Sequence, residues 1–231
     1  FVDMDNAGGA AAAVEHLIAG GRRCVATITG PLDMTAGQLR LEGYTSALAR
    51  HGLPELIEHG DFSENSGRVG ARRLLERAPG LDAIFCASDQ MAIGALAELA
   101  AAGRRVPEDV AVVGFDDSPT SLYTSPSLTT VHQPVEDMGA RMVQTLSRMI
   151  ENPGEPVSDV VLPTHLVSGT PASTETGSAG VIAKHVQLSQ SVLARHHPSL
   201  KGQDHRHACT GRIHRRPRLD RGRGGRGRRG R

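Results

Sequence analysis

Residues 106–134 read VPEDVAVVGFDDSPTSLYTSPSLTTVHQP. The apolar run VAVVGF ends in two adjacent aspartates, Asp116 and Asp117, and a second short β-branched run, LTTV, follows after a polar loop. A strand without alternation of apolar and polar residues is typical of a parallel sheet covered on both faces. The segment therefore predicts a buried strand with two carboxylates at its carboxyl end.

The rest of the first 170 residues alternates between helical and strand-like segments. We expect helices at 7–20, 35–52, 65–80, 88–103 and 135–152. We expect strands at 24–30, 56–59, 81–87, 109–115 and 157–167. This alternation predicts an α/β fold with parallel sheets flanked by helices. Ligands bind such sheets outside the carboxyl ends of the strands.

Polar pairs follow two of these strands. Asp116 and Asp117 come after one strand, and Ser88 and Asp89 come after another. An aspartate in this place often only caps the next turn or helix. From their position alone, capping is the more frequent role for each pair, and a ligand contact is the alternative.

Composition divides the chain near residues 170–175. The first 174 residues hold 12 arginines, no lysine and 22 acidic residues, whereas the last 57 hold 12 arginines, 2 lysines and 3 acidic residues. All phenylalanines and tyrosines lie in the first part. We expect 173–231 to be a disordered tail rich in arginine, glycine and histidine. Its basic charge would allow non-specific binding of nucleic acid, but no aromatic residue is present there to stack on bases.

Several chemistries are excluded or disfavoured. Without lysine, residues 1–174 hold no Walker A loop and no Schiff-base lysine. We find no catalytic constellation and expect no cofactor and no metal site, because the histidines around 196–207 and Cys209 fit no standard metal spacing. Three scattered cysteines favour a reducing cytoplasm. No apolar run is long enough to predict a membrane span.

Five motifs together resemble the LacI/GalR family of transcriptional regulators. They are VPEDVAVVGFDD, TSPSLTTVHQPVEDMG, AIFCASDQMAIGAL, TGPLDMTAGQLRLEGY and HGDFSENSG. The resemblance covers about residues 1–168 and implies a type I periplasmic-binding-protein-like fold. In that fold a small effector binds between two lobes and controls the grip of a helix-turn-helix on operator DNA.

The resemblance also implies an organisation. Residues 1–172 would form an effector-binding and dimerisation domain of a homodimer. Its C-terminal lobe would comprise 7–131 and 164–172, and its N-terminal lobe 1–6 and 132–163. We expect an incomplete N-terminal lobe with exposed apolar faces, and a DNA-binding headpiece missing from the N-terminal side.

Individual positions carry over from the family. Arg40 matches an arginine that binds sugar hydroxyls or a carboxylate, Asp116 matches an effector-binding aspartate, and Phe62 matches an aromatic that packs on the effector. The alternatives are a surface charge for Arg40 and an ordinary core residue for Phe62. Ser88, Gln133, Asp5 and the adjacent Asn6 would border the cleft. Asp89 would cap the helix that follows it, and Asp117 the turn that follows it. Met91, Ile93 and Tyr123 would lie in the dimer interface, or else in the core.

The family's last strand usually continues into an arginine, which LVSGTPAST lacks. The Arg/Gly/His-rich remainder matches nothing in the family, and a shifted reading frame is one hypothesis for it. A second reading of the fold is an exported solute-binding protein of a sugar transporter. The GFDD and LTTVHQP motifs favour the regulator.

Overall fold

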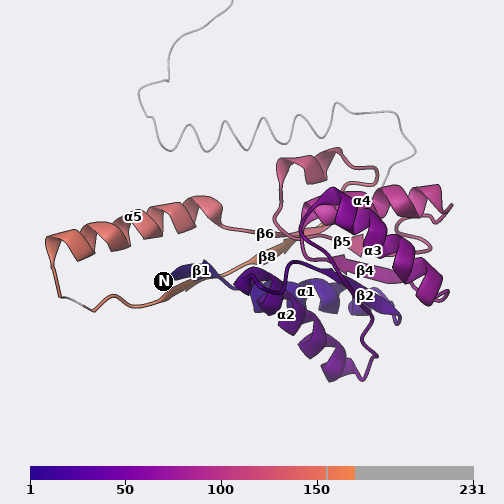
Figure 1. Cartoon of the computed structure of the whole chain (residues 1–231), viewed down its shortest axis with the longest axis horizontal. Coiled ribbons are helices and arrows are strands. Elements are labelled where there is room, and N and C mark those ends of the chain that lie inside the picture. Colours follow the sequence, from indigo (N-terminus) through magenta and orange to yellow (C-terminus); the bar gives the residue numbers. More distant parts are fainter. Residues whose placement is uncertain (155, 170–231) are drawn as a thin grey trace, which may run out of the picture. The chain divides into compact units, whose positions relative to one another are not determined.

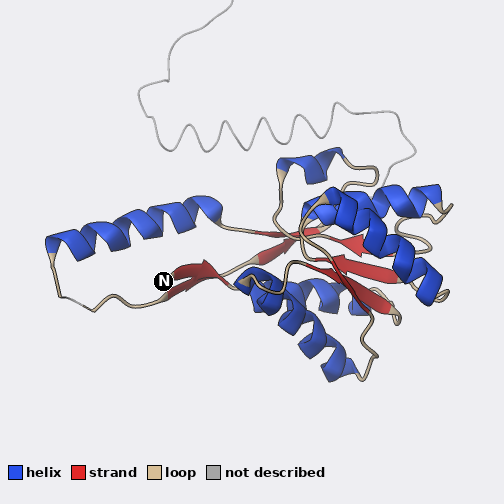
Figure 2. Cartoon of the chain, viewed as in Figure 1, coloured by secondary structure: helices blue, strands red, loops and turns tan. Residues whose placement is uncertain are grey.

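A computed structural model describes residues 1–154 and 156–169. Within them the chain alternates between strands and helices (Figures 1 and 2). The elements are β1 Val2–Met4, α1 Asn6–Ala19, β2 Val25–Thr29, α2 Thr35–His51, β3 Ile57–His59, α3 Glu64–Arg77, β4 Ala83–Cys86, α4 Asp89–Ala101, β5 Ala111–Val113, the 3-10 helix η1 Pro119–Tyr123, β6 Thr130–His132, α5 Val135–Glu151, β7 Val160–Leu162 and β8 His165–Val167. The predicted α/β class is confirmed.

Four strands form a parallel sheet in the order β3-β2-β4-β5. Helices α1 and α2 pack together and contribute to one apolar core with Val25, Phe85 and Phe115. Helices α3 and α4 form the other layer, over a second core that contains Ile28 and Ile84. Alternate residues of β2 and β4 thus enter different cores, which is why both strands are buried along their whole length.

Close approach between α3 and α4 depends on two glycines. A Cβ on Gly67 would overlap the carbonyl oxygen of Met91, and a Cβ on Gly94 would overlap that of Glu64. The two helices therefore meet backbone to backbone. This contact fixes the start of α4, which follows β4 directly.

Two smaller sheets join the remaining strands. Strand β1 pairs with β7 in parallel, and β6 pairs with β8 antiparallel, with His132 opposite His165. The predicted strand at 157–167 is wrong as a single element, because Pro163 separates β7 from β8 and has no amide hydrogen to donate. Strands β1 and β6 are not among the predicted strands, because neither lies in an extended apolar run.

Other predicted boundaries also change. The helix predicted at 65–80 ends at Arg77, because Ala78 precedes a proline and leaves the helical conformation. The strand predicted at 109–115 shortens to β5, since the amides of Asp109 and Val110 both bond to the Arg105 carbonyl in a turn.

Helix α5 has no buried residue among those described. It is strongly amphipathic, with charged residues on one face and apolar residues on the other. Its large exposed apolar residues are Val135, Met142, Val143, Leu146, Met149 and Ile150. This exposed stripe agrees with the expectation of uncovered apolar surface in this part of the chain.

Candidate ligand-binding site

Strained backbone marks the carboxyl edge of the four-stranded sheet. Among the described residues, the non-glycine residues with positive φ are Phe62 at 68°, Asp116 at 117° and Asp117 at 53°. Phe62 follows β3 and the two aspartates follow β5. Such conformations cost on the order of 1–3 kcal/mol each and are held only by their surroundings. Because strained residues cluster at functional sites, this edge of the sheet is the candidate ligand-binding site.

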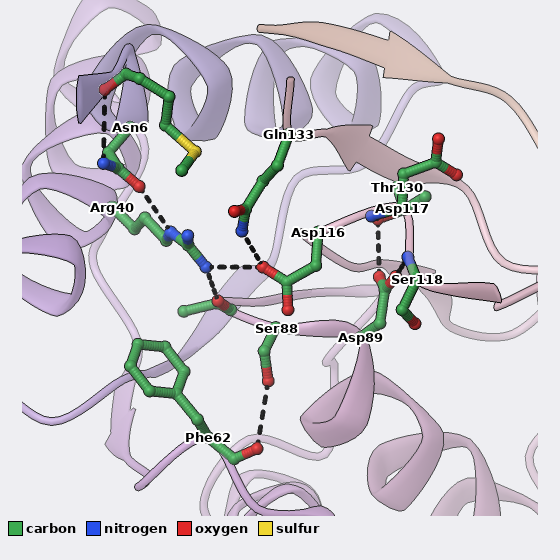
Figure 3. Close-up of polar contacts among 12 residues, drawn as sticks. Asn6, Arg40, Phe62, Ser88, Asp89, Asp116, Asp117, Ser118, Thr130 and Gln133 are labelled. Carbon is green, nitrogen blue, oxygen red and sulfur yellow. Dashed lines mark hydrogen bonds and ion pairs between the residues drawn. The ribbon is translucent and has the colours of Figure 1, made fainter. Parts of the chain in front are cut away.

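Arg40 reaches this edge from α2 with only 5% of its side chain exposed. Its Nε donates to Asn6 Oδ1 at 2.9 Å, and its Nη1 donates to the Ala87 carbonyl at 2.6 Å and to Asp116 Oδ1 at 3.1 Å (Figure 3). The alternative of a surface helix charge is thereby excluded. A buried guanidinium needs such a set of partners to offset its lost hydration.

Asp116 is the more exposed partner, with 31% of its side chain accessible. Its Oδ1 also accepts a hydrogen bond from the Gln133 side-chain amide, and its backbone amide donates to the Val131 carbonyl at 2.9 Å. Burial raises the pKa of Asp116, although Arg40 and Gln133 act in the opposite direction. Burial likewise lowers the pKa of Arg40, against the effect of Asp116. The pair therefore presents opposite charges that compensate each other.

Two aromatic rings enclose the guanidinium. Arg40 Cζ lies 3.8 Å from the centre of the Phe115 ring and 5.7 Å from that of Phe62. Phe115 is a site residue that the sequence analysis missed, and its only signal is its place directly before Asp116. The Phe62 ring lies so close to Gly30 that a Cβ there would overlap it. A glycine after β2 thus leaves the space that this aromatic ring occupies.

The residue that caps helix α4 is Ser88 and not Asp89. Ser88 Oγ accepts from the Met91 amide at 3.2 Å and caps α4, so capping by Asp89 is wrong. Asp89 is fully buried, and its carboxylate accepts from Thr130 Oγ1 at 2.6 Å and from the Ser118 amide at 2.7 Å (Figure 3). Burial raises the pKa of Asp89 to about 6, while the bonds from Thr130 and Ser118 oppose the shift.

Asp117 does not cap the following turn either. Its Oδ2 lies 2.8 Å from His132 Nδ1, and its amide donates to Thr130 Oγ1 at 3.3 Å. The residue at the N-terminus of η1 is Ser118, which makes no side-chain capping bond. The Asp117 carboxylate contacts the His132 imidazole on β6 instead of the next turn.

At the start of α1, Asn6 and not Asp5 contacts the buried Arg40 side chain. Asp5 is exposed, and its Oδ1 accepts from the Gly8 amide at 2.7 Å and caps α1. Asn6 is buried and bonds to Arg40. Both residues line a hollow of about 470 Å³ that also includes Thr35 and Leu39. A ligand contact from Asp5, as from Ser88, stays a prediction.

The three residues expected at a dimer interface differ in exposure. Met91 is completely buried in the core with α3, so it is a core residue and not part of an outer face. Ile93 is partly exposed, and Tyr123 in η1 is 79% exposed.

The histidines around 196–207 and Cys209 lie outside the described residues. Within the described part, no group of three metal-ligating side chains could hold a metal ion.

Known proteins resemble this chain in sequence and in structure. The family described as periplasmic binding protein-like domain matches residues 14–170. The HTH-type transcriptional regulator CelR of Thermobifida fusca is 49% identical over 171 residues, and the ribose operon repressor of Escherichia coli K12 is 39% identical over 170. A solved transcriptional regulator CelR–cellobiose complex has a TM-score of 0.71 and 46% identity, covering 74% of this chain and 53% of that chain.

These matches establish the family. The chain belongs to the family of periplasmic-binding-protein-like domains, within the LacI-type regulators. The matched region is 72% of this chain, and it spans about half the length of the curated relatives, 50% for CelR and 49% for the ribose operon repressor. Residues 1–154 and 156–169 include no helix with the length and hydropathy that crossing a membrane requires.

Proposed function

We propose that this chain is the effector-sensing and dimerisation region of a LacI/GalR-type transcriptional regulator that acts as a repressor. A small sugar-like ligand binds between two lobes, and the resulting closure alters operator binding by a helix-turn-helix outside these residues. The observation that carries this proposal is the Arg40–Asp116 pair at the carboxyl edge of the sheet, where the backbone of Asp116 is held in a strained conformation.

The pair suits a neutral ligand with adjacent hydroxyl groups. A carboxylate accepts hydrogen bonds from hydroxyls, and a guanidinium or amide donates to them. Because the charges of Arg40 and Asp116 compensate each other, an anionic ligand would bring an uncompensated charge into the site. Phe62 lies beside them and offers an apolar face to a sugar ring.

We further propose that residues 1–172 act as one domain of a homodimer. Residues 7–131 and 164–172 make the C-terminal lobe, and residues 1–6 and 132–163 belong to the N-terminal lobe. Tyr123 and Ile93 remain the candidates for the subunit interface, since both have exposed surface.

A solute-binding protein of a transporter is the second candidate. The names of the relatives favour the regulator, because they describe an HTH-type regulator and an operon repressor. We therefore assign a binding role rather than catalysis, and we place the whole protein in the cytoplasm, where operator DNA lies.

A ligand panel tests this function. We would measure the melting temperature of the chain with neutral mono- and disaccharides, including cellobiose and ribose, and with the matching sugar acids. A ligand at 100 times its dissociation constant adds about 2.7 kcal/mol to the free energy of unfolding, which raises the melting temperature of a domain this size by roughly 5–10 °C. The proposal is wrong if no neutral sugar stabilises the chain or if the acids stabilise it more.

A further inference from the structure

The backbone around Asp116 is held mainly by one neighbouring strand. The Asp116 amide donates to the Val131 carbonyl at 2.9 Å, and the Asp117 amide donates to Thr130 Oγ1 at 3.3 Å. The one ionic contact in this set joins Asp117 Oδ2 to His132 Nδ1 at 2.8 Å. All three contacts come from consecutive residues of β6, the strand that leads toward α5.

These contacts oppose a real conformational cost. Asp116 and Asp117 both have positive φ, at 117° and 53°, without being glycine. Left alone, the two residues would relax to ordinary backbone conformations, and the Asp116 carboxylate would turn away from its present place. The pair of Asp117 and His132 is half-buried, with 25% and 39% of the side chains exposed.

We propose that His132 is a positioning residue for the ligand site. It acts through Asp117, which it anchors to β6, and so keeps the Asp116 carboxylate beside Arg40 and Gln133. This inference rests on the proposed function only for the identity of the ligand. It also links the site to β6, a strand outside the four-stranded sheet that leads toward α5, so that a shift of β6 is transmitted to Asp116.

The protonation of the pair follows from its chemistry. An ionised carboxylate can only accept a hydrogen bond, so His132 Nδ1 carries a hydrogen when it bonds to Asp117. The bond therefore needs a nitrogen donor at this position more than it needs a positive charge. Other ionisable groups nearby are His165 on β8, whose ring centre is 4.8 Å from that of His132, and Asp116 itself. Asp89 reaches the same loop from α4 through Ser118.

Three variants separate this role from general damage to the strand. His132→Leu removes the donor and keeps much of the volume. His132→Asn keeps a nitrogen donor, because the asparagine Nδ2 superposes on the imidazole Nδ1. His51→Leu is the matched control, since His51 is similarly exposed and also pairs with a carboxylate, that of Glu15, but does not contact Asp117 or His132.

Two measurements on the full chain apply to each variant. Hydrogen exchange of the Asp116 and Asp117 amides reports the loop without any ligand, and calorimetry reports the affinity for cellobiose. We expect His132→Leu to speed exchange and to weaken cellobiose binding, each by about fivefold, as for loss of a partly exposed charged hydrogen bond. His132→Asn and His51→Leu should stay within about twofold of the wild type, because both keep a nitrogen donor beside Asp117.

The proposal is overturned if His132→Leu leaves amide exchange unchanged, or if His132→Asn behaves like His132→Leu. If the wild type does not bind cellobiose, that result bears on the proposed ligand alone. The exchange data then decide the positioning role.

Discussion

The guanidinium of Arg40 supports the carboxylate of Asp116 from the protein side, across 76 positions of sequence. The two side chains lie 3.1 Å apart, yet 5% of the arginine and 31% of the aspartate are exposed. The arginine is therefore the inner partner and the aspartate the outer one. Under the proposed function, a ligand that approaches this edge of the sheet would meet the Asp116 carboxylate. Arg40 fixes the orientation of that carboxylate.

Removal of Arg40 should destabilise the chain. Arg40→Ala leaves Asp116, Asn6 and the Ala87 carbonyl without their buried donor, and we expect a loss of about 3–5 kcal/mol in the free energy of unfolding. Arg68→Ala, on the exposed side of α3, is the control and should stay within about 0.5 kcal/mol. Urea unfolding measures both. A loss below about 1 kcal/mol for Arg40→Ala would show that the buried contacts are not formed.

Asp89 should make stability depend on pH. Its pKa is about 6 in the folded chain, above the usual value of 3.8, so the folded state binds more protons than the unfolded state between these values. Stability is therefore greatest at low pH for this group and falls as the pH rises through the folded pKa, by about 3 kcal/mol in all. The loss is complete about one pH unit above the folded pKa, near pH 7.

Asp89→Asn isolates this contribution. Urea unfolding of both proteins between pH 4 and 7.5 gives the difference in the free energy of unfolding, in which other ionisable groups cancel. We expect the wild type to lose stability relative to Asp89→Asn up to about pH 7 and to run parallel above it. Parallel curves over the whole range would contradict the burial of an ionised Asp89.

Replacing a glycine by alanine should have opposite effects on stability in α4, which contacts α3, and in the exposed α5. Gly94→Ala places a methyl group against the Glu64 carbonyl, so we expect a loss of more than about 2 kcal/mol in stability. Gly139 in α5 has open space around its Cβ position, and Gly139→Ala should add up to about 1 kcal/mol through helix propensity. Thermal unfolding of both variants checks this. Equal effects would mean that α3 and α4 do not meet at Gly94.

The sequence predicted the fold because its strands carry a strong local signal. The apolar runs of β2, β4 and β5 and the glycines between elements determine an α/β alternation without any knowledge of distant contacts. Strand β6 lacks such a signal, because it lies in a short β-branched run and is defined by its antiparallel pairing with β8, a segment distant in sequence.

The site was predicted less completely, since its contacts are tertiary. The motifs pointed to Arg40 and Asp116, which the structure brings together. No local pattern distinguishes Ser88 from Asp89 as the cap of α4, because both types of side chain cap helices. Met91 likewise has a fixed position on α4, but only the packing of α3 decides that it faces inward.

Calorimetric titration of cellobiose into the wild type, Asp116→Asn and Asp109→Asn tests the central claim most directly. Asp109 lies before β5, at the opposite end of the strand, and pairs with Arg105 on the surface, so its variant makes the same chemical change away from the site. We expect Asp116→Asn to weaken binding by about 10- to 100-fold, as for loss of a charged hydrogen-bond acceptor, and Asp109→Asn to bind like the wild type. Equal affinities in all three proteins would contradict a ligand site at Asp116.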